Sequence, residues 1–131
     1  MIRSYKDPSI ALSIDQFLET EAKKIRAHDL RDLRRFSARL VEKTLLPEAR
    51  QHFDLHTGVQ ILIRILESPI TETAADPLPQ DLAELVVAGR YLLRGADFIP
   101  DWIPEIGLTD DARILARVFE RHPSLADRTN T

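Results

Sequence analysis

The sequence predicts an all-α fold, a single compact bundle of about five helices with a structured loop, rich in proline and aspartate, before the last helix. A chain of 131 residues fits one domain and can bury a core without disulfides or a metal. Hydrophobic residues make up 44% and charged residues 30%, a composition typical of globular proteins. Aromatic residues are few, and the abundant leucine, isoleucine, alanine, arginine and glutamate favour helix over sheet.

The first half of the chain contains two helical patterns. Asp7 followed by Pro8 is a helix-start signal, and the apolar residues after it recur at helical spacing, which predicts a first helix over about 8–27. His28 and Asp29 mark a break or a new cap. A second helix then carries one stripe, made of Leu30, Leu33, Ser37, Leu40, Val41 and Thr44, and Pro47 lies near its end.

The apolar run Val59–Leu66 fits either a buried strand or a buried helix. Since the chain offers no second strand-like run to pair with it, a strand would leave backbone groups unsatisfied, and we expect a central helix over about 55–67. The polar, proline-containing stretch that follows is expected to be a connection. Pro79 then opens the next helix, with Asp81 and Glu84 near its positive end.

Thr109 or Asp110 is expected to cap the last helix, which ends before Pro123. We expect residues 122–131 to form a frayed tail. Between the last two helices lies the stretch DFIPDWIPEIGLTDD, residues 97–111, which holds two prolines, one glycine, the single tryptophan and five carboxylates.

The residues around this stretch resemble the signature of the YkvA-like family, domain of unknown function 1232, over about residues 79–121. The resemblance depends on Tyr91, Leu92, Leu93, Asp97, Ile99, Pro100, Asp101, Ile103, Pro104, Gly107, Asp110 and Asp111. Family members usually have Ser-Pro before the first aspartate, where this chain has Arg94, Gly95 and Ala96. The resemblance implies a small helical unit, often near membrane-associated segments, and it implies no reaction.

The acidic loop 97–111 has two interpretations. In the first, Asp97, Asp101, Asp110 and Asp111 cap turns and helix ends, and Pro100, Trp102, Pro104 and Gly107 shape and anchor the loop. In the second, the same four aspartates hold a hard cation such as calcium or magnesium, in a metal-binding protein or metal-dependent enzyme. The spacing is not that of an EF-hand, and the first interpretation is favoured. The sequence therefore predicts no cofactor.

A basic flank extends over residues 23–39, and Arg31, Arg34, Arg35 and Arg39 lie on one side of the second helix. Such a flank suits an anionic membrane surface, or it is a solvated face that pairs with the acidic half of the chain. No aromatic residues are interleaved to stack on bases, so nucleic acid is not favoured.

The remaining residue types suggest no catalytic site. His52 and His56 are spaced four apart, but Phe53 stands where a zinc protease motif has glutamate, and the chain has no cysteine. No serine lies in a nucleophile-elbow context. The sequence therefore predicts a non-enzymatic interaction or scaffold domain that is cytoplasmic or peripheral to a membrane. Its expected partner is a protein, a second copy of the chain or an anionic membrane surface.

Overall fold

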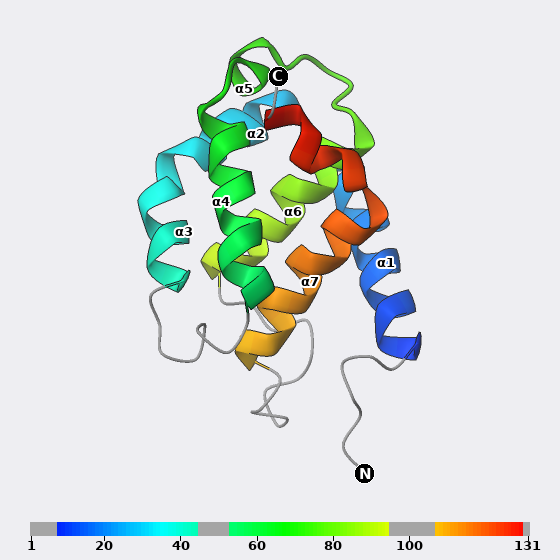
Figure 1. Ribbon diagram of the computed structural model, residues 1–131. Helices are drawn as coiled ribbons and strands as arrows, with labels where there is room; N and C mark the ends of the chain where they lie inside the picture. The colour runs from blue at the N-terminus through cyan, green and yellow to red at the C-terminus, as the bar shows by residue number, and fades with distance from the viewer. Residues whose placement is uncertain (1–7, 45–52, 95–106, 130–131) are drawn as a thin grey trace.

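The computed structural model describes residues 8–44, 53–94 and 107–129, and within them the side chains of residues 14–42, 56–93 and 113–128. The described residues form an all-α bundle in which no segment is a strand, as the sequence predicts. Figure 1 shows the arrangement. The elements are α1 Pro8–Ala22, α2 Ala27–Leu33, η1 Arg34–Phe36, α3 Ser37–Thr44, α4 Phe53–Glu67, α5 Pro69–Thr73, α6 Gln80–Arg94, α7 Gly107–Arg121 and η4 Pro123–Thr129.

Helix α6 is the centre of the bundle. It contacts α1, α2, α3 and α7, and every residue from 81 to 89 is buried. Helices α4 and α7 pack against each other in front of it, and α1 and α3 lie at opposite edges (Figure 1). Phe17 of α1 meets Tyr91 of α6 edge to face, with ring centroids 5.8 Å apart. This packing explains why α6 is buried almost all round.

Two helix boundaries in the first half differ from the expected ones. The first helix ends at Ala22, because the N–H groups of Lys24 and Ile25 turn back to carbonyls three residues earlier. The expected second helix is three short elements in a row, α2, η1 and α3, of which η1 is a 3₁₀ turn. The core stripe is nevertheless continuous, since Leu30, Leu33 and Leu40 are all buried.

The stretch after α4, which the sequence predicts to be a connection, contains a short helix. Ser68 is the N-cap of α5 and Pro69 its first residue, an arrangement that suits proline because the first turn leaves its N–H groups unpaired. Thr71 is buried, and its hydroxyl donates to the Ile65 carbonyl oxygen at 2.6 Å. The Ser-Pro pair was the signal for this helix.

The end of the chain also differs from expectation. Helix α7 begins at Gly107, so Thr109 and Asp110 lie inside its first turn and do not precede it. The predicted frayed tail over 122–131 is wrong for residues 123–129, which form η4 against α4 and α7. Leu125 is fully buried there and holds the segment to the core.

Candidate interaction surface

The acidic loop that drew attention in the sequence is largely outside the described residues. Asp97, Pro100, Asp101, Trp102 and Pro104 fall there. Gly107, Asp110 and Asp111 belong to the start of α7, and their side chains are also outside the described set. Whether these aspartates cap the loop or share a cation stays a prediction.

The four arginines of the predicted basic flank divide into two pairs. Arg31 donates from Nη1 to the carbonyl oxygen of Ala74 at 3.0 Å, and Arg34 lies 3.4 Å from a Glu72 carboxylate oxygen. Both therefore fasten α5 and the loop after it to the α2–η1 segment. Arg35 and Arg39 are exposed, and neither has an ion-pair partner among the described side chains. The second pair is available to a ligand from outside.

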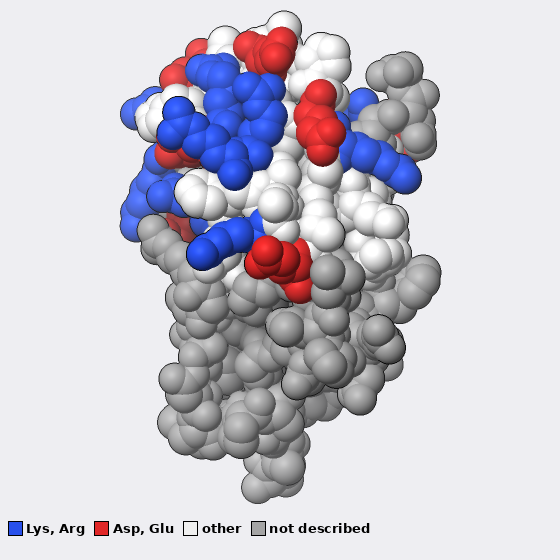
Figure 2. All heavy atoms as spheres, turned by 90° about the vertical axis from the view of Figure 1, so that its left-hand side faces the viewer, with Lys and Arg blue, Asp and Glu red and all other residues white. Residues whose placement is uncertain are grey.

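The arginines share their segment with the two large hydrophobic side chains that are exposed within the described part of the chain. Phe36 is 46% and Val41 is 42% exposed. We call Arg31, Arg34, Arg35 and Arg39 together with Phe36 and Val41 the arginine face. Figure 2 shows Lys and Arg side chains gathered on the upper part of this side of the molecule, with Asp and Glu among them.

A shallow groove borders this face where η1 meets the end of α6. It has a volume of about 300 Å³ and is lined by Asp29, Asp32, Leu33, Phe36, Arg90 and Leu93. Three of the lining residues are apolar, and the other three carry charges of both signs. A second hollow of about 340 Å³ lies between α4 and α7, where Gly58 and Phe119 are among the lining residues.

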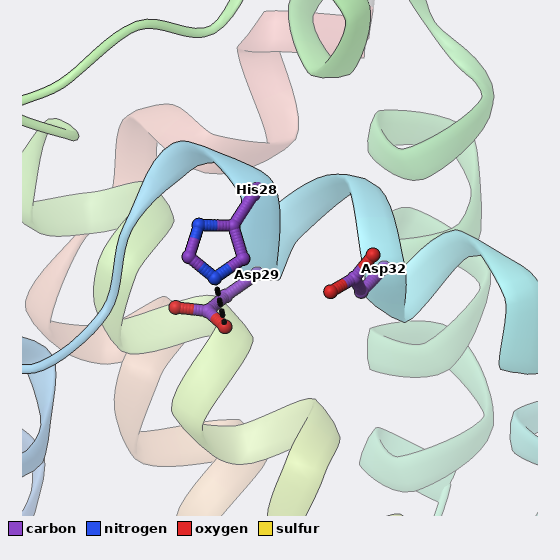
Figure 3. Close-up of side chains that lie close together, drawn as sticks. All are labelled: His28, Asp29 and Asp32. Carbon is purple, nitrogen blue, oxygen red and sulfur yellow. Dashed lines mark ion pairs between the residues drawn. The ribbon is translucent and has the colours of Figure 1, made fainter.

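Three potential metal ligands lie together at the start of α2. They are His28, Asp29 and Asp32, and their ligand atoms all lie within 4.8 Å of one another. In Figure 3 the His28 ring points its Nε2 atom toward Asp29, at 3.3 Å from the Oδ1 atom, and Asp32 lies one turn further along. In the sequence, His28 and Asp29 indicate only a break between helices. Their spacing from Asp32 was the available signal.

An ion-pair network centred on the buried Glu84 joins α1, α6 and α7. Glu84 of α6 is fully buried, and it accepts from Arg121 Nε at 2.8 Å, Arg121 Nη2 at 3.0 Å and Gln80 Nε2 at 2.6 Å. His122 Nε2 lies 3.0 Å from the same carboxylate, within ion-pair distance when the ring is protonated. The angle between the ring and the carboxylate does not fit a hydrogen bond. Arg117 and Arg121 both reach Asp15 of α1.

These contacts set the charge states of the network. Burial alone would raise the pKa of Glu84, but the hydrogen bonds from Arg121 and Gln80 and the contact with His122 outweigh burial, so the pKa lies below its ordinary value. The hydrogen bond from Arg117 lowers the pKa of Asp15, and the hydrogen bond to Glu84 raises the pKa of Arg121. All three groups are therefore charged at neutral pH, and the network serves to hold three helices together.

Comparison with known proteins agrees with the resemblance noted in the sequence. Residues 81–116 match the family described as a protein of unknown function, DUF1232. The match covers α6 and the first part of α7 and includes Glu84. No curated protein and no solved structure matches the chain. Within the described residues, none of the helices has the length and apolar character that crossing a bilayer requires.

Proposed function

We propose that this chain is a non-enzymatic interaction module that docks on an anionic membrane surface through the arginine face. The observation that carries the proposal is the coincidence of Arg35 and Arg39 with Phe36 on one exposed segment. Arginine donates paired N–H groups to lipid phosphates, and an exposed phenylalanine can enter the boundary between headgroups and acyl chains.

The position of the segment supports the same ligand. Helix α3, which carries Arg39, lies at the outer edge of the bundle (Figure 1). Arg31 of α2 bonds the Ala74 carbonyl after α5, and Arg34 of η1 pairs with Glu72 of α5, so the exposed pair belongs to a segment whose backbone is braced by contacts with the bundle. A braced arginine loses less conformational freedom on binding than one on a loose loop.

The expected contribution of Arg35 and Arg39 to membrane affinity is modest. Each basic residue near an anionic bilayer contributes about 1 kcal/mol, so that removing Arg35 and Arg39 should cost about 2 kcal/mol, or roughly thirtyfold in affinity. Higher salt should weaken the binding of the unaltered chain as well, because the attraction between exposed charges is screened.

Flotation with vesicles of phosphatidylcholine, with and without phosphatidylserine, tests the proposal. The unaltered chain should float with the anionic vesicles only, and the double variant Arg35→Ala, Arg39→Ala should lose about thirtyfold in apparent affinity. Phe36→Ser should also weaken binding. The control is Lys23→Ala, Lys24→Ala, which removes two positive charges from the exposed turn between α1 and α2, inside the predicted basic flank but outside the arginine face.

Two outcomes would contradict the proposal. A chain that stays out of the floating fraction with both vesicle compositions has no membrane affinity, and its arginine face is then a solvated or protein-binding surface. Equal losses for the arginine variant and the lysine control would show that only net charge matters and that the face has no special role.

A further inference from the structure

We propose that His28, Asp29 and Asp32 form a binding site for a divalent first-row transition metal ion, with zinc as the reference ion. The site uses side chains of α2 that the membrane proposal does not invoke, so the two proposals stand or fall separately. Zinc and its neighbours take imidazole nitrogen together with carboxylate oxygen, which is the ligand set present here.

The three ligand atoms are close enough to share one ion. Atoms that all lie within 4.8 Å of one another lie within about 2.8 Å of a common point, which is 4.8 Å divided by the square root of three. Bonds from zinc to nitrogen or oxygen are about 2.0–2.2 Å long. Each atom must therefore move inward by at most about 0.6–0.8 Å, the difference between 2.8 Å and these bond lengths. The His28 side chain is 65% exposed and Asp32 is exposed, so both side chains have solvent beside them into which they can rotate.

Among the three proposed ligands, Asp29 has a carboxylate that a backbone hydrogen bond already holds in place. Its Oδ2 atom accepts from the backbone N–H of Arg26 at 2.8 Å, which fixes the carboxylate at the start of the helix. Its Oδ1 atom remains directed at His28 Nε2. A ligand whose second oxygen is held by a backbone hydrogen bond is orientated before the metal arrives, which is how outer-shell partners tune known metal sites.

His28 and Asp32 are four residues apart and therefore share one side of α2, with Asp29 between them. Among the described side chains the Asp32 carboxylate has no ion-pair or hydrogen-bond partner. Asp29 and Asp32 are three apart on the helix, where like charges repel. A divalent cation would remove this repulsion and would balance the two negative charges.

The environment leaves room for further ligands. Asp29 and Asp32 also line the groove bounded by Phe36 and Leu93, so one side of the ion would face open space. Three protein ligands with an open fourth position is the arrangement of zinc sites that also hold water or an external group. The proposed ion would therefore be exchangeable and would lie beside the arginine face.

Cobalt absorption and zinc calorimetry on the full-length chain, first stripped with EDTA and dialysed, test the site. One ion should bind per chain, with visible cobalt bands that zinc abolishes. His28→Gln and Asp32→Asn should each weaken zinc binding by about tenfold or more, because each removes one of three ligands. The control is His56→Gln, which alters another exposed histidine, one whose Nε2 atom lies 3.1 Å from the Gln60 side chain.

Thermal melts accompany each variant to show that it is folded, which we expect because both altered side chains are exposed. The proposal is wrong if the unaltered chain shows no saturable binding of cobalt or zinc. It is equally wrong if Asp32→Asn binds zinc as the unaltered chain does, or if His56→Gln abolishes binding, since the ion would then lie elsewhere.

Discussion

Replacing Glu84 by glutamine should destabilise the fold by about 3 kcal/mol at neutral pH. Glu84 is completely shielded from water and accepts three hydrogen bonds from Arg121 and Gln80. The variant keeps the shape but removes the charge, and its amide group would direct two donors at groups that are themselves donors. Breaking a buried ion pair from one side costs about 3–5 kcal/mol, and the surviving carbonyl of glutamine places this change at the lower end.

The loss should depend on pH in a defined direction. The pKa of Glu84 is below its ordinary value of 4.5 in the folded chain, so the ion pair stabilises the fold fully above that ordinary value. As the pH falls below it and through the lowered folded pKa, the unaltered chain gains a proton at Glu84 and loses this stabilisation. The difference between the unaltered chain and Glu84→Gln should therefore be largest near pH 7 and shrink in acid.

Urea denaturation followed by circular dichroism, at several pH values between 7 and 3, measures both quantities. A second variant, Glu84→Gln with Arg121→Gln, removes both charges, and its loss should be smaller than the sum of the two single losses because it leaves no unpaired buried charge. If Glu84→Gln is as stable as the unaltered chain at pH 7, or if the two losses simply add, the network does not hold the helices together.

Other contacts give further predictions, each measurable by the same denaturation assay. Gly58→Ala should destabilise by about 1–2 kcal/mol, because the new Cβ would lie 2.7 Å from Leu115 Cδ2 and 3.1 Å from its Cγ, and this crowding outweighs the helix gain. Gly89→Ala should cost less, since the new Cβ meets only the ends of the Leu33 and Leu62 side chains, and a larger loss than at Gly58 would contradict this reasoning. Leu125→Ala should lower the free energy of unfolding by about 2–5 kcal/mol because Leu125 is fully buried. An unchanged free energy of unfolding would indicate that this segment is the frayed tail expected from the sequence. Asp15→Asn should cost about 1 kcal/mol, reduced by partial exposure to solvent, and a loss as large as that of Glu84→Gln would show that α1 depends on this pair more than its burial indicates.

The sequence predicts the parts of the fold that depend on local pattern. The apolar stripes of α4 and α6 repeat at helical spacing, and Pro79 marks a helix start, so both helices are found within two residues of their expected starts. The break between α1 and α2 is less visible in the sequence, because Ile25 continues the apolar stripe although the backbone has already turned at Ala22. The two short elements differ in this respect. The Ser68-Pro69 pair is a local signal for α5, whereas η4 depends on the burial of Leu125 against α4 and α7, which no local pattern contains.

The side chains of the candidate site likewise divide into those that a sequence pattern indicates and those that only folding brings together. The arginines of the arginine face were found because four like charges within nine residues are conspicuous in a sequence. The structure then separates Arg31 and Arg34 from Arg35 and Arg39 through partners on α5 and the following loop, some forty residues away in the chain. The Glu84 network was missed because Asp15 and Arg117 are separated by 102 residues, and only folding brings them together.

The segment that matches DUF1232 contains buried carboxylates whose partners lie outside that segment. The matched segment, 81–116, contains both Asp81 and Glu84, which are buried. Their cationic partners lie beyond its end, since Arg128 of η4 binds Asp81 through two hydrogen bonds and Arg121 binds Glu84. Buried carboxylates without such partners would be costly. In this chain the matched pair of helices therefore depends on the residues that follow it, and through Asp15 on α1 as well, so it is the core of a larger unit and not a unit that closes on itself.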